Sequence, residues 1–106
     1  MPELVKIVVT VPEENADQIR QAVGAAGGGK VGNYEFCSFS SKGMGRFLAV
    51  EGANPAIGSV GEPEVVTEER IEFTCEKEQL ASVVAALRAV HPYEEPAIDI
   101  YPLLSL

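Results

Sequence analysis

The sequence predicts an α+β fold that is made of two strand–helix–strand halves. Each half begins with an apolar run of extended character and continues with an amphipathic helical pattern. A shift of about 64 positions places Ile7 on Ile71 and Ile19 on Val83, so the two halves match in register. Two such units form a ferredoxin-like double βαβ sandwich, in which a mostly antiparallel sheet carries both helices on one face.

The length of the chain fits one domain. A chain of 106 residues buries roughly two thirds of the surface that its unfolded form exposes, so its core is large enough to be stable without disulfides or a structural metal ion. We therefore expect residues 1–106 to form a single ferredoxin-like domain.

The first half begins with one strand and one helix. Residues 4–11 predict a strand, because every second residue is apolar and falls on the same face. Pro12 and the acidic residues after it favour a helix start, and apolar residues then recur at helical spacing up to Ala26. The glycines at 27–29 predict the end of this helix, since glycine adopts a left-handed cap without steric cost.

The segment between the halves predicts an extra strand or hairpin. Residues 33–40 and 46–51 are expected to be strands, joined by a turn at 41–45. Residues 52–63 are rich in glycine and proline and nearly uncharged, which favours a structured excursion at the sheet edge. Such a loop could bind a ligand or cover an exposed strand.

The second half repeats the plan of the first. Residues 64–75 predict a strand, residues 76–90 a helix, and residues 97–103 the last strand. The sheet face without helices carries mixed polar and apolar side chains, so it could face solvent or another subunit.

The composition is acidic and argues against two classes of partner. With 16 Asp+Glu against 8 Lys+Arg, the formal charge of −8 would repel nucleic-acid phosphates and anionic lipid headgroups. No membrane-spanning run or secretory signal pattern is visible, so we expect a cytoplasmic protein. Cys37 and Cys75 lack CxxC spacing, which favours free thiols.

The stretch HPYEEPAIDIYPL contains the only histidine of the chain, His91. Together with Cys37 and one of Glu94 or Glu95, it could form an open three-ligand site for a divalent ion such as zinc or copper. A neighbouring subunit could complete that site. A Cys37–His91 dyad would instead be typical of a nucleophilic enzyme, with Asp99 or Glu94 orienting the imidazole.

The same stretch also has a purely structural explanation. His91 suits the C-terminus of a helix, Pro92 prevents the helix from continuing, and Pro96 keeps the preceding residue out of helical geometry. No glycine pattern of a phosphate-binding loop and no G-x-S-x-G motif is present.

Four stretches resemble a known family: GNYEFCSFSSKGMGRF, EGANPAIGSVGEPE, EERIE and HPYEEPAIDIYPL. They are similar to the inserted domain of the Nif-three-like dinuclear-metal proteins, and to free-standing proteins built from that module alone. The resemblance covers almost the whole chain and implies a CutA- and PII-like fold. The dinuclear site of that family belongs to the other domain, and its ligands have no counterpart in a chain with one histidine.

The resemblance also implies a functional cluster. Its members are Asn33, Tyr34, Cys37, Gly52, Asn54, Pro55, His91, Pro92, Tyr93, Glu94, Glu95 and Pro96. Within this cluster, we expect ligand contacts from Asn33, Tyr34, Cys37, Asn54, Pro55 and Tyr93, and metal contacts from Cys37, His91, Glu94 and Glu95. CutA proteins form trimers associated with divalent-metal tolerance, and PII proteins bind nucleotides between subunits, but a shared fold does not transfer function.

From the sequence we expect a non-catalytic binding or regulatory module that acts as a homo-oligomer, either a dimer or a trimer. It would take a small ligand or a metal ion near the GNYEFC and HPYEEP segments. Its cofactor is unidentified, with a divalent metal ion as the candidate. The alternatives are a zinc or copper protein and a Cys/His-dependent enzyme.

Overall fold

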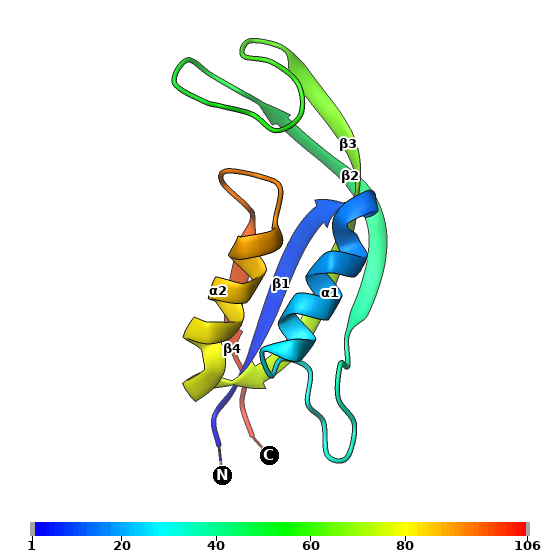
Figure 1. Cartoon of the computed structure of the whole chain (residues 1–106), viewed down its shortest axis with the longest axis vertical. Helices are drawn as coiled ribbons and strands as arrows, with labels where there is room; N and C mark the ends of the chain where they lie inside the picture. Colours follow the sequence, from blue (N-terminus) through cyan, green and yellow to red (C-terminus); the bar gives the residue numbers. More distant parts are fainter. Residues whose placement is uncertain (1, 106) are drawn as a thin grey trace.

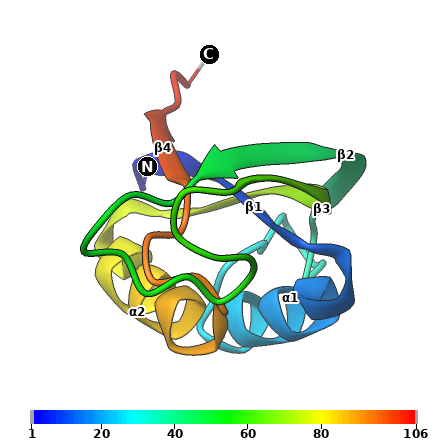
Figure 2. The same ribbon diagram turned by 90° about the horizontal axis from the view of Figure 1, so that it is seen from above.

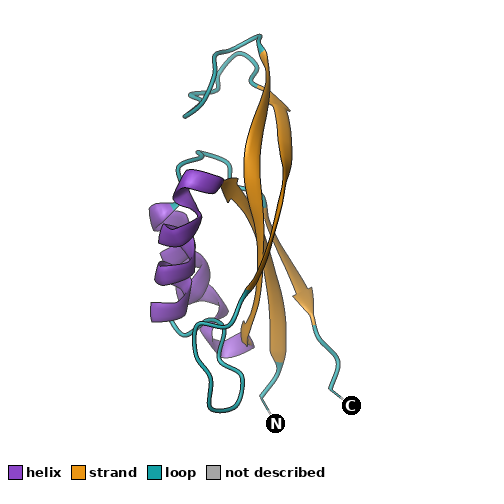
Figure 3. Cartoon of the chain, turned by 90° about the vertical axis from the view of Figure 1, so that its right-hand side faces the viewer, coloured by secondary structure: helices purple, strands orange, loops and turns teal. Residues whose placement is uncertain are grey.

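A four-stranded antiparallel sheet with both helices on one face makes up the structure, a computed structural model that describes residues 2–105 (Figures 1 and 3). The elements are β1 (Leu4–Pro12), α1 (Ala16–Ala25), β2 (Phe39–Leu48), β3 (Pro63–Glu76), α2 (Leu80–Val90) and β4 (Ile98–Pro102). The strand order is β2-β3-β1-β4, and all neighbouring strands are antiparallel. The α+β ferredoxin-like fold that the sequence predicts is confirmed.

The core lies between the sheet and the helix layer. β1 contributes Val5, Ile7, Val9 and Val11, each at most 6% exposed, which is the apolar face that the alternation predicts. The apolar face of each helix packs against the sheet, with Ile19 of α1 and Leu87 of α2 fully buried. No helix among residues 2–105 is long and apolar enough to cross a bilayer.

Both helices begin later than the sequence predicts. A single turn of 3₁₀ helix precedes each one, Glu13–Asn15 before α1 and Lys77–Gln79 before α2. The glycine-rich end of α1 is as expected, since Gly27 has a φ of 104° and Gly28 donates its N–H to the carbonyl of Val23 at 2.8 Å.

The segment between the two halves differs from the prediction. Residues 33–40 and 46–51 are not two strands joined by a turn. β2 runs unbroken and pairs with β3 along its whole length, from Phe39 opposite Glu72 to Leu48 opposite Pro63. β2 is therefore the second strand of the first half, it forms a long hairpin with β3, and residues 2–105 contain no extra strand between the halves.

Gly43 and Gly45 predict a turn because tight turns favour glycine. Neither has a positive φ, and both pair within the ladder, Gly43 with Glu68 and Gly45 with Val66. Gly45 instead makes room for a neighbour, because a Cβ at this position would overlap the Glu68 carboxylate.

The hairpin extends beyond the rest of the sheet. β1 ends at Pro12 opposite Glu68, so residues 63–67 of β3 pair only with residues 44–48 of β2. The loop at the tip, residues 49–62, folds back over the connection between α2 and β4 (Figures 1 and 2). Both termini lie at the opposite end of the molecule (Figure 1).

Candidate ligand-binding groove

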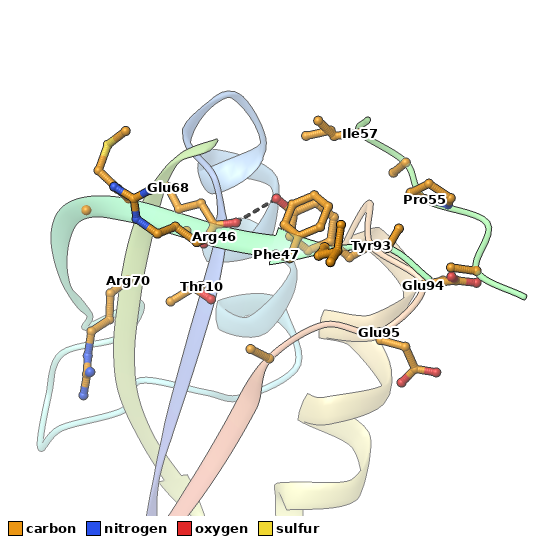
Figure 4. A pocket seen from close by; sticks show the side chains of 18 of the residues that line it. Thr10, Arg46, Phe47, Pro55, Ile57, Glu68, Arg70, Tyr93, Glu94 and Glu95 are labelled. Atoms are coloured by element: carbon orange, nitrogen blue, oxygen red, sulfur yellow. Dashed lines mark hydrogen bonds between the residues drawn. The ribbon is translucent and has the colours of Figure 1, made fainter. Parts of the chain in front are cut away.

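A groove of about 670 Å³ lies between the hairpin extension, its tip loop and the connection that follows α2 (Figure 4). The tip loop provides apolar wall residues, among them Pro55 and Ile57, and the connection provides Tyr93, Glu94 and Glu95. A volume of this size falls in the range of small-molecule sites, about 300–1,000 Å³.

Glu68 and Tyr93 form the polar centre of the groove. The Tyr93 hydroxyl donates to Glu68 Oε2 at 2.7 Å, and Glu68 is only 7% exposed (Figure 4). Burial is the main cause that raises the pKa of Tyr93, and the bond to Glu68 raises it further, so the phenol stays protonated as a donor. The ring of Tyr93 meets Phe47 edge to face, with centroids 6.0 Å apart.

The strand register explains how these groups meet. Gly45, Phe47 and Glu68 lie on the same face of the hairpin, because Gly43 is opposite Glu68 and side chains alternate along each strand. The missing side chain at Gly45 leaves the space that the Glu68 carboxylate occupies.

His91 anchors the connection below the groove. It is 8% exposed, its Nδ1 accepts the N–H of Tyr93 at 3.1 Å, and its Nε2 lies 2.9 Å from the carbonyl oxygen of Thr10. These two bonds require the neutral tautomer with the proton on Nε2. Burial lowers the pKa of His91, partly offset by the bond to Thr10 and by the nearby Glu68 charge. Both ring nitrogens are therefore occupied.

A hydrogen bond to a side chain ties the tip loop to the connection. The backbone N–H of Asn54 donates to Glu94 Oε1 at 2.8 Å. Of the residues expected at the site, Asn54, Pro55, Tyr93, Glu94 and Glu95 thus lie around the groove, and His91 lies directly beneath it.

Cys37, Asn33 and Tyr34 lie at the other end of the sheet. Cys37 donates its N–H to the carbonyl of Gly29, and Gly29 donates to the carbonyl of Thr74, which pairs with Lys6 of β1. His91 contacts Thr10, four residues further along β1, which corresponds to about 13 Å of strand.

This separation changes the expected chemistry. The chain does not bring Cys37 together with His91, so neither the three-ligand site with Glu94 or Glu95 nor the Cys37–His91 dyad is assembled within one subunit. Among residues 2–105, no group of three His, Cys, Asp or Glu side chains could hold a metal ion.

Phe47 and Glu68 were missed as site residues. Glu68 stands in the charged run EPEVVTEER, which is typical of a solvated strand. The alternation of side chains does place Glu68 on the face without helices, but the contact with Tyr93 depends on the path of the long hairpin.

No protein-family model matches the chain. Curated relatives named "GTP cyclohydrolase 1 type 2 homolog" are 52% identical to it, over 102 residues in Mycobacterium bovis and over 100 residues in Halalkalibacterium halodurans. These alignments cover 96% and 94% of this chain but only 27% of each relative, so the chain spans about a quarter of their length.

Solved structures show similarity to the same group of proteins and to two further ones of the same fold. A Bacillus cereus protein related to NIF3 matches with a TM-score of 0.83 and 43% identity, over 96% of this chain and 26% of that one. CutA from Archaeoglobus fulgidus matches with a TM-score of 0.67 and 23% identity, over 94% of this chain and 83% of that one. GlnK from Bacillus subtilis matches with a TM-score of 0.63 and 17% identity, over 95% of this chain and 85% of that one. The last two show the fold alone.

The resemblance seen in the sequence is confirmed: over almost its whole length this chain is similar to a domain-sized segment of the NIF3-related proteins, and it has the fold of CutA and GlnK.

Proposed function

We propose that this chain is a non-catalytic binding module with a regulatory role, and that it takes a small organic ligand in the groove below the tip loop. The observation that carries the proposal is the groove itself. It combines apolar walls with a few polar groups, which is typical of small-molecule sites.

The position of the motif residues supports the same function. Two stretches far apart in the sequence, GANPAIG and HPYEEP, meet at the groove and are joined by the bond between Asn54 and Glu94. A connection that served only to end α2 would not need to meet the tip loop. The contact between the two segments forms the wall of the groove.

The chemistry around the groove supports binding over catalysis. The single histidine uses both ring nitrogens to hold the backbone, and the half-buried Cys37 lies at the other end of the sheet. A nucleophile and a base within hydrogen-bond reach are what covalent catalysis requires. The relatives' name refers to proteins about four times as long, so we do not extend it to this chain.

A divalent ion is the weaker alternative for the ligand. Two of the matched structures are named divalent cation or divalent ion tolerance proteins, CutA and CutA1, but the donors expected here lie far apart. Zinc or copper would need a second subunit to complete its ligand set.

Homo-oligomer formation belongs to the proposal as well. Phe39 and Met44 of the edge strand β2 are 68% and 59% exposed, and Tyr101 of the other edge strand is 47% exposed. Edge strands with large apolar side chains are sites at which sheets pair with other chains.

A fragment screen followed by NMR tests the groove. We expect ligands that bind to shift the backbone amides of residues 43–57 and 93–97. Ala53→Trp should abolish this binding, because Ala53 lines the groove and a large ring there would fill it.

Ala85→Trp is the matched control, since Ala85 is exposed on α2 and does not line the groove. Fragments that leave the groove amides unchanged, or that bind Ala53→Trp as well as the native chain, would contradict the proposed function.

A further inference from the structure

The buried carboxylate in the groove has no cationic partner. Glu68 is 7% exposed, yet its carboxylate forms no salt bridge with any residue in the range 2–105, and the single hydrogen bond that this carboxylate accepts there comes from the Tyr93 hydroxyl. A carboxylate offers about four acceptor positions, and a buried charge without a counter-charge is unfavourable. The site therefore has capacity for a further donor with positive charge.

The unused oxygen of Glu68 faces the groove. Oε1 accepts no hydrogen bond in the described part of the chain, whereas every fully enclosed side-chain nitrogen or oxygen there has a partner. Oε1 therefore keeps access to the groove, which Glu68 lines. A ligand could reach it directly.

Aromatic rings flank this carboxylate. Tyr93 and Phe47 meet edge to face with centroids 6.0 Å apart, and both line the groove beside Glu68 (Figure 4). Aromatic faces attract ammonium groups through the ring quadrupole, most strongly where water is excluded. A carboxylate beside aromatic rings favours an organic cation over an anion.

Basic residues also line the groove, but none of them pairs with Glu68 in the described part of the chain. Arg70 pairs with Glu72 at 3.3 Å, and Lys42 pairs with Glu13 at 3.5 Å. Arg46 also lines the groove (Figure 4), but within residues 2–105 it forms no salt bridge with Glu68.

The surroundings also favour a cation with an apolar body. The groove wall above the rings is apolar at Pro55 and Ile57 (Figure 4). Glu94 and Glu95 lie at its rim, and the chain carries a formal charge of −8, which attracts cations over distance.

We propose that the ligand of this groove is an organic ammonium ion with an apolar body, whose charged group binds Glu68 Oε1 beside Phe47 and Tyr93. The inference rests on the proposed binding function and names the chemical class of ligand. The aromatic rings and the tip loop hold the apolar part, and Glu68 selects the charge.

Three probes of the same shape test the charge: phenethylammonium, phenylpropionate and the neutral phenethyl alcohol. In NMR titrations of the full chain we expect phenethylammonium to shift the amides of Gly45, Phe47 and Tyr93 and to bind tightest. Glu68→Gln should weaken its binding about ten-fold or more, because hydrogen bonds to charged groups are about twice as strong as neutral ones.

Glu78→Gln is the control variant, since it removes one negative charge from the turn before α2, far from the groove. It should bind the probe as the native chain does. A thermal melt of Glu68→Gln establishes that this variant is folded before its affinity is compared.

The outcomes separate the two proposals. Preferential binding of phenylpropionate, or equal binding by native chain and Glu68→Gln, would overturn the cation assignment and leave the groove as a binding site. Absence of binding by all three probes would also overturn the cation assignment, and a fragment screen without groove ligands would overturn the binding function itself.

Discussion

Gly45 is the residue on which the position of Glu68 depends. Its backbone is ordinary for a strand, so its role is to leave out a side chain where the carboxylate lies. Phe47 and Glu68 then share one face with Tyr93 between them. Several features of the groove thus follow from the absence of a single methyl group.

Gly45→Ala should destabilise the chain by about 1–3 kcal/mol, because the new Cβ overlaps the Glu68 carboxylate and must displace it from Tyr93. Urea unfolding measures the change. Gly43→Ala is a matched control in the same strand, since a Cβ there would meet nothing within 4 Å. Equal stability of the two variants would show that Glu68 moves aside without loss.

His91 should make stability depend on pH. Its folded-state pKa is lowered from 6.5 by burial, so below that value the unfolded chain binds more protons than the folded chain. The contribution of neutral His91 is complete above the ordinary pKa and is lost as the pH falls through the folded value. Protonation of Nδ1 also removes the acceptor for the Tyr93 N–H.

We therefore expect the native chain to lose stability between about pH 7 and pH 5, and His91→Gln to lose less over the same range. Unfolding free energies at several pH values measure the difference. An NMR titration of His91 with a pKa above 6.5 would contradict the predicted sign.

At the scale of elements, apolar periodicity predicts most of the fold. Alternation in residues 4–11 and helical spacing after Pro12 correspond to β1 and α1, and the glycine run at 27–29 ends the helix. The continuity of β2 through residues 41–45 was missed because glycine in a strand resembles glycine in a turn, and only the partner across the ladder distinguishes them.

The tip loop should be restrained by the bond between Asn54 and Glu94. Glu94→Ala removes the acceptor, so we expect faster backbone motion of residues 52–58 in NMR relaxation and faster proteolytic cleavage there. Glu95→Ala is the control, because Glu95 lines the groove next in sequence but makes no hydrogen bond to the loop in residues 2–105. Equal loop motion in both variants would contradict this role.

At the scale of the whole molecule, the site was predicted only in part. The sequence grouped Asn54, Pro55 and Tyr93 with Glu94, and the structure places these residues around one groove. It also grouped Cys37 with them, but in the structure Cys37 lies at the other end of the sheet. Distance across a sheet depends on strand register and hairpin length, and neither is encoded in one motif.

The assembly of the chain is a prediction at the same scale. Exposed apolar side chains on both edge strands, with Phe39 at 68% and Tyr101 at 47% exposed, lead us to expect a dimer or a trimer in solution. Light scattering coupled to size exclusion measures the mass. Phe39→Lys should reduce it, whereas Lys30→Glu, on an exposed loop residue, should not.

The central claim is that the groove between the hairpin tip and the connection after α2 binds a small ligand. A crystal structure of the chain soaked with phenethylammonium tests it most directly. We predict density for the ring against Phe47 and Tyr93, with the nitrogen within hydrogen-bond distance of Glu68. Density only at the end of the sheet that holds Cys37, or an empty groove at saturating probe, would contradict the claim.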